Sequence, residues 1–137
     1  MAGPSVHEAL IYLMVVTSAS DRDMTDAELG RIGEVIRSWP IFVDFDHEKL
    51  IPIAQDCQRL LHQDEGLDGV LTHASRAIPE RLHDTAYAAA YEVAVVDLEM
   101  RLEEARLLER LRQRLDVEPE LADAIERAAK VRHRMLT

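Results

Sequence analysis

The sequence has few of the residues and segments that disulfide-bonded, β-rich or membrane-spanning proteins contain. Its single cysteine, Cys57, excludes an intramolecular disulfide and a cysteine-based zinc cluster. Aromatic residues make up only 4% of the chain, and glycine and proline number five each, a composition that favours helices. The longest apolar run, residues 9–16, is too short to cross a bilayer. We therefore expect a soluble, cytoplasmic protein.

Positive charge is also scarce in this chain. Its 16 lysine and arginine residues face 26 acidic residues, which leaves a formal net charge of −10 at pH 7. Such a chain repels phosphate backbones and anionic lipid surfaces, so nucleic acid is not an expected partner. A basic cluster near the C-terminus suits a solvent-exposed helix end, where the helix dipole favours cations. Its members are Arg127, Lys130, Arg132, His133 and Arg134.

Helical periodicity runs along nearly the whole chain, and no alternating strand pattern of useful length competes with it. The segments Ser5-x-x-Glu8 and Thr25-x-x-Glu28 are capping boxes that start the first two helices. Pro52 predicts a kink or a separate first turn in the third. We predict an all-α fold of about seven helices in a compact bundle, forming a single domain over residues 1–137. The expected helices cover residues 5–18, 25–39, 46–61, 67–78, 79–96, 102–115 and a last segment that begins at Pro119.

The distribution of apolar residues predicts which helix faces are buried. The first and fifth helices are apolar nearly all round, so we expect both at the centre of the fold. The other helices are amphipathic. In the sixth we expect Leu102, Ala105, Leu108 and Leu111 to face inward, and in the last an inward stripe of Leu121, Ala124, Ile125, Ala128 and Val131.

One acidic pattern, Asp-x-x-Met-x-x-x-Glu, occurs twice. A shift of 76 positions places Asp21 on Asp97, Met24 on Met100 and Glu28 on Glu104. In each copy an apolar helix ends, a few residues turn the chain, and an amphipathic helix begins near the glutamate. The repeat predicts a duplicated helix-turn-helix unit whose two halves pack about a pseudo-twofold axis.

Two interpretations of these junctions are open. An aspartate after a helix C-terminus faces the negative end of the helix dipole, and either the N–H groups of the next helix or a cation can compensate it. For a cation, the predicted ligands are Asp21, Glu28, Asp97 and Glu104, with Asp23 and Glu99 as secondary candidates. Such all-oxygen ligands favour Ca²⁺, Mg²⁺ or Mn²⁺. Glu28 is explained by its capping box, whereas Glu104 follows Arg101, a poor N-cap residue.

The segment 18–29, together with Asp97 and residues 103–108, resembles the TerB-like tellurite-resistance family. Residues 68–71 and 82–87 carry the resemblance through the middle of the chain. It implies an all-helical, pseudo-duplicated domain in tellurite resistance and wider stress responses, alongside membrane-associated and metal-binding partner proteins. It also implies metal binding at the acidic junctions and no catalytic reaction. This chain departs from the family in having Asp97-Leu98 where Asp-Gly is common, and in placing Arg101 and Arg106 near the acidic residues.

These observations predict a non-catalytic stress-response adaptor that binds a divalent cation, located in the cytoplasm or held at the inner face of the membrane by a partner. The alternative is a metal-free interaction scaffold, with Trp39 and Phe42 as anchor residues unless they form a lid on the core. A metalloenzyme is a remote third hypothesis. Its only support is Glu80-x-x-His83, half of a di-iron signature that has no second copy in the chain.

Overall fold

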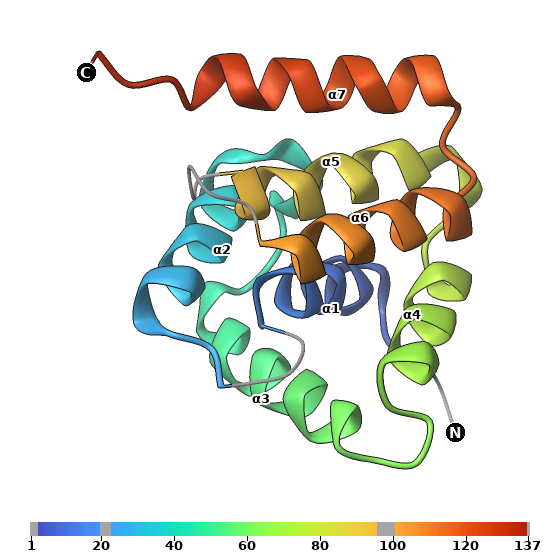
Figure 1. Cartoon of the computed structure of the whole chain (residues 1–137). Coiled ribbons are helices and arrows are strands. Elements are labelled where there is room, and N and C mark those ends of the chain that lie inside the picture. The colour runs from blue at the N-terminus through green and yellow to red at the C-terminus, as the bar shows by residue number, and fades with distance from the viewer. Residues whose placement is uncertain (1–2, 20–22, 96–100, 137) are drawn as a thin grey trace.

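We analysed a computed structural model that describes residues 3–19, 23–95 and 101–136. Within these ranges the chain forms seven α-helices and three short 3₁₀ helices, without strands, which confirms the predicted all-α bundle (Figure 1). The α-helices are α1 (Val6–Ala19), α2 (Asp26–Ser38), α3 (Leu50–Leu61), α4 (Gly66–Ala77), α5 (His83–Val95), α6 (Leu102–Arg114) and α7 (Pro119–Arg132). The 3₁₀ helices are η1 (Pro40–Phe42), η2 (His47–Lys49) and η3 (Glu80–Leu82).

Helix α1 is the centre of the bundle and packs against α3, α4 and α5. It begins in the predicted capping box, in which the Ser5 N–H donates to Glu8 Oε1 (2.8 Å) and the Glu8 N–H donates to Ser5 Oγ (3.1 Å). Every residue from Ala9 to Ala19 is buried, because α1 has no polar face to turn toward water. Its two buried hydroxyls, Thr17 and Ser18, donate to the carbonyls four residues earlier. The prediction of a central first helix is confirmed.

The expected boundaries also appear where the sequence places them. Pro40 ends α2 and starts η1, and Asp46 caps η2 by accepting from the Glu48 N–H at 3.0 Å. Pro52 lies in the first turn of α3, just after η2, which is the separate first turn that the sequence predicts. Gly66, with φ of +52°, adopts the left-handed conformation that turns the chain from α3 into α4.

The buried faces of the last two helices differ from the prediction. In α6 the buried residues are Glu104, Leu107, Leu108 and Leu111, whereas Leu102 is 61% exposed and Ala105 is also exposed. In α7 the helix buries Ala122 and Ala129 and turns most of its predicted apolar stripe outward. Both helices carry apolar residues on more than one face. In α6, Leu108 and Leu111 are buried as predicted and only part of the expected face is exposed, whereas α7 packs through its other face.

The secondary structure repeats with the same offset as the acidic pattern. A shift of 76 positions places α2, Asp26–Ser38, on α6, Leu102–Arg114. The buried positions correspond as well: Glu28, Ile32 and Val35 match Glu104, Leu108 and Leu111. The local repeat is therefore present in the helices, while the pseudo-twofold axis between the two halves stays a prediction.

Within residues 3–19, 23–95 and 101–136, none of the helices is both long enough and apolar enough to cross a membrane.

Candidate functional site

At the first junction, Glu28 helps to start α2. Thr25 is the N-cap residue; its Oγ1 accepts from the Glu28 N–H (3.2 Å), and its own N–H donates to Glu28 Oε1 (2.9 Å). Both bonds of the predicted capping box are therefore present. The Glu28 side chain is nonetheless buried, with a residue exposure of 8%. Its position is explained by the start of the helix.

At the second junction, an arginine takes the place of the capping threonine. The backbone of Arg101 (φ −70°, ψ 154°) nearly matches that of Thr25 (φ −79°, ψ 161°), but its side chain caps no N–H group. Instead, Arg101 Nε donates to Glu104 Oε1 at 2.9 Å and forms an ion pair with it. Glu104 is also 8% exposed. A buried carboxylate needs a compensating charge, and in this junction Arg101 supplies one.

The six predicted cation ligands are only partly placed. Asp21, Asp97 and Glu99 lie outside the described residues, and Asp23 is exposed just before α2. Among the residues that are described, no three His, Cys, Asp or Glu side chains converge in a group able to hold a metal ion. Within the described ranges, Glu28 is hydrogen-bonded at the start of α2 and Glu104 at the start of α6.

The two predicted interaction residues occupy different environments. Phe42 is 1% exposed and packs in the core, where its ring stacks on His7 (centroids 5.4 Å apart) and meets Phe45 edge-on at 6.0 Å. His7 Nε2 lies 2.7 Å from the Ile41 carbonyl oxygen and fixes this corner. Trp39 is partly buried against the same core. Phe42 is thus a core residue of the lid and is not presented to a partner.

His83, from the half di-iron motif, has a structural position. Its Nε2 lies 2.9 Å from the Ile78 carbonyl oxygen and its Nδ1 lies 3.1 Å from the Leu115 carbonyl oxygen. Both ring nitrogens are therefore directed at backbone carbonyls, and Glu80 is exposed. His83 connects the end of α4 to the end of α6. Sequence spacing alone gave no sign of this role, because the two carbonyls come from distant parts of the chain.

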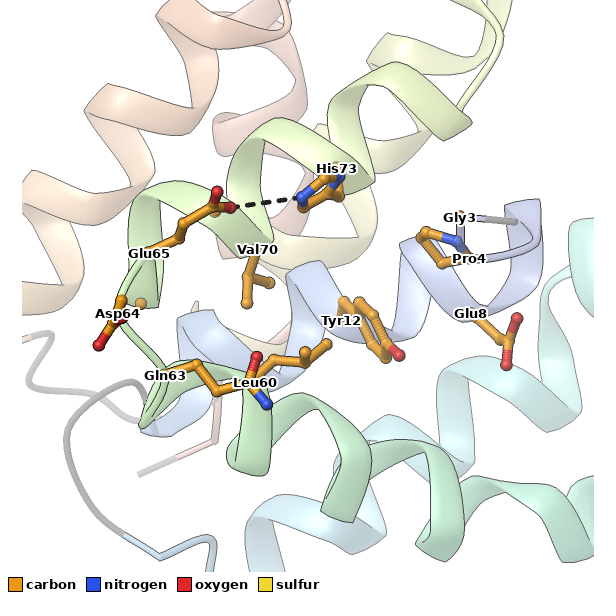
Figure 2. Close-up of a pocket in the computed structure, with 12 residues that line it drawn as sticks. Gly3, Pro4, Glu8, Tyr12, Leu60, Gln63, Asp64, Glu65, Val70 and His73 are labelled. Carbon is orange, nitrogen blue, oxygen red and sulfur yellow. Dashed lines mark ion pairs between the residues drawn. The ribbon is translucent and has the colours of Figure 1, made fainter. Parts of the chain in front are cut away.

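A pocket of about 920 Å³ opens between the start of α1, the end of α3 and the first half of α4 (Figure 2). Tyr12, Leu60 and Val70 form its apolar wall, as Figure 2 shows. Burial raises the pKa of Tyr12 to about 12, so its phenol stays protonated at neutral pH. The sequence gives no sign of this pocket, because its walls come from three separate helices.

The edge of the pocket carries negative charge. Glu8, Asp64 and Glu65 surround it, and His73 Nε2 lies 3.5 Å from Glu65 Oε2 in an exposed contact (Figure 2). An apolar wall with an acidic edge suits a ligand that combines a positive group with an apolar one.

No protein-family model matches the sequence, and comparisons with curated proteins and with solved structures also yield no match. The resemblance to the TerB-like family therefore stays a prediction from the quoted residues.

Proposed function

We propose that this chain is a non-catalytic, TerB-like adaptor of the tellurite and stress response, and that its acidic junctions start helices instead of holding a metal. One observation carries the proposal: both described junction carboxylates are bonded inside the chain, Glu28 to the Thr25 N–H and Glu104 to the Arg101 guanidinium. Each of these carboxylates thus has a hydrogen-bond donor beside it, and for Glu104 the donor is a cation that offsets its charge. Its partners are other tellurite-resistance or stress-response proteins of the cytoplasm, including proteins attached to the inner face of the membrane.

The pocket between α1, α3 and α4 is the surface through which we propose that the adaptor works. Its wall and edge suit a partner segment with a lysine or arginine beside an apolar side chain. Asp64 and Glu65 are exposed, so their charge can be reversed without disturbing the core. They are the residues with which to test this proposal.

A divalent cation at the junctions is the second candidate function. It is favoured by the burial of two carboxylates, Glu28 and Glu104, at equivalent positions of a repeated element. An ion would neutralise the acidic residues at the junctions, and Ca²⁺, Mg²⁺ and Mn²⁺ suit such oxygen ligands.

Calorimetric titration and thermal unfolding with Ca²⁺, Mg²⁺, Mn²⁺ and Zn²⁺ separate the two candidates. The adaptor proposal expects no binding heat and no rise in Tm with any ion. A rise in Tm for the wild type that is lost in the Asp97→Asn, Glu104→Gln double variant would overturn it in favour of the cation site, because a ligand stabilises only the state that it binds.

Growth in tellurite tests the role itself. Cells that lack the protein are complemented with the wild type, with an Asp64→Lys, Glu65→Lys variant, or with the control Glu34→Lys, which changes an exposed charge on α2. We expect the pocket variant to lose protection and the control to keep it. Equal survival with and without the wild-type protein would confine the TerB-like resemblance to the fold.

A further inference from the structure

Helix α7 lies along one edge of the molecule, beyond α5 and α6 (Figure 1). Apolar residues are exposed along one of its faces. Leu121 is 41% and Val131 is 55% exposed, and Ala124 and Ala128 between them are exposed as well. Just past the helix end, Met135 is 68% exposed. The exposed apolar residues thus recur at alternating intervals of three and four, the spacing of a coiled-coil seam. We call the face formed by Leu121, Ala124, Ala128 and Val131 the α7 seam.

The seam is free because α7 is attached through its other face. Ala122 and Ala129 are buried in the core. The Tyr87 hydroxyl donates to Glu126 Oε2 at 2.9 Å, and Glu92 of α5 pairs with Arg132 at 2.5 Å. These contacts hold the helix on α5 and set its rotation. The α7 seam is therefore directed away from the bundle by fixed contacts.

Charge along α7 is divided between its two halves. Exposed acidic residues, Glu118, Glu120 and Asp123, lie at its start, and exposed basic residues, Arg127, Lys130 and Arg134, lie at and beyond its end. Residues 118–136 contain four acidic residues and four lysine or arginine residues, so this segment is neutral although the chain carries −10. The net charge of −10 opposes the association of two copies, and this neutral segment adds nothing to that repulsion. An antiparallel second α7 places acidic half against basic half, whereas a parallel one opposes like charges.

We propose that two copies of this chain associate through the α7 seam, with their α7 helices antiparallel. The helix has 14 residues and is therefore about 21 Å long at 1.5 Å per residue. A contact of this length is small, of the class below about 1,200 Å² that forms weak, reversible complexes. The proposal is independent of the adaptor function, since it concerns a different surface.

Sedimentation of the full chain tests the seam. We expect the weight-average sedimentation coefficient to rise with concentration between about 10 µM and about 1 mM, the range of a weak interface. Val131→Asp puts a charge in the seam and should raise the dissociation constant at least about tenfold. The matched control is Ile51→Asp on α3, which is 54% exposed and lies away from α7 (Figure 1); it should leave the dissociation constant unchanged.

Charge exchange tests whether opposite charges on the two α7 helices hold the copies together. Glu118→Arg, Glu120→Arg makes both halves of α7 basic, and Arg127→Glu, Arg134→Glu makes both halves acidic. Each double variant should be monomeric alone, while an equimolar mixture should regain the dimer, a recovery that a locally frayed helix cannot produce. Circular dichroism of each variant checks that α7 remains folded.

Four outcomes would overturn the proposal. They are a wild type that stays monomeric throughout the range, a Val131→Asp variant that associates like the wild type, an Ile51→Asp variant that loses association equally, and a mixture that does not regain the dimer. Monomeric wild type that co-sediments with phosphatidylserine-containing vesicles, and stops doing so with Val131→Asp, would assign the seam to a membrane surface instead.

Discussion

Replacing Glu92 with glutamine tests how α7 is held on the bundle. Glu92 lies on α5, and its side chain is 13% exposed. Its Oε1 accepts from Arg132 Nη2 at 2.5 Å, and its Oε2 lies 2.6 Å from His133 Nε2. Glutamine keeps one acceptor oxygen but turns an NH₂ group toward the other donor. The substitution therefore removes one of the two hydrogen bonds. It also removes the negative charge that faces both Arg132 and His133.

The expected cost follows from these contacts. Removing a hydrogen bond to a charged group costs about 1.5–3 kcal/mol. Arg132 is 52% exposed, so water replaces part of what it loses, and we expect a decrease of about 2 kcal/mol in the free energy of unfolding. In a domain of this size about 1 kcal/mol corresponds to about 4 °C, which gives a fall in Tm of about 8 °C at pH 7.

The dependence on pH has a definite sign. Burial raises the pKa of Glu92, but the hydrogen bonds and charges of Arg132 and His133 outweigh it and hold the pKa below its ordinary value of 4.5. A carboxyl with a lowered folded pKa stabilises the fold above its unfolded pKa, and this contribution is lost as the pH falls through the folded pKa. The difference in Tm between wild type and Glu92→Gln should therefore be present at about pH 6 to 7 and shrink as the pH falls below about 4.

Thermal unfolding followed by circular dichroism measures both effects. The control is Glu34→Gln, the same chemical change at an exposed position on α2, which should change Tm by no more than about 1–2 °C. The reasoning is refuted if Glu92→Gln unfolds like the control at pH 7, or if its deficit is as large at pH 3 as at pH 7.

The remaining predictions concern single positions. Thr25→Ala should lower the free energy of unfolding by about 1 kcal/mol in urea titrations, because it removes half of the capping box, while Thr25→Ser should cost little. Gly69→Ala should lower stability by about 1–3 kcal/mol, because the new Cβ would lie 2.6 Å from Glu65 Cβ. Gly30→Ala, with nothing within 4 Å of its new Cβ, should raise stability by about 0.5–1 kcal/mol; equal Tm shifts for the two would contradict this. Burial raises the pKa of Cys57 to about 12, so its thiol should react with Ellman's reagent at pH 8 only after unfolding; rapid reaction of the native protein would contradict its burial.

Helix starts and stops were predictable because they depend on neighbours in the chain. The Ser5 and Thr25 capping boxes and the turn at Pro40 involve residues no more than three positions apart. The burial of α1 was predictable for a related reason: a helix without a polar face has only one stable environment. At the acidic junctions the sequence correctly distinguished Glu28, which has a capping partner, from Glu104, which lacks one. The position of Arg101 also indicated a residue that can neutralise Glu104.

The outward rotation of α7 was not predictable from its sequence. Two faces of α7 suit burial: the predicted apolar stripe, and the face that carries Ala122 and Ala129. The choice between these faces depends on Glu92 and Tyr87, residues about 40 positions away. The pocket and the position of His83 have the same origin, since each needs groups from helices that are distant in sequence.

The sequence by itself thus determined an all-helical chain, its helix boundaries, its apolar centre and its repeated junction, because all of these follow from local spacing and local hydrogen bonds. Only the tertiary structure decided which side of α6 and α7 is covered, where a pocket opens, and which surface stays apolar and exposed. Those features arise where helices meet, and a one-dimensional pattern does not contain the contacts that select among equally apolar faces.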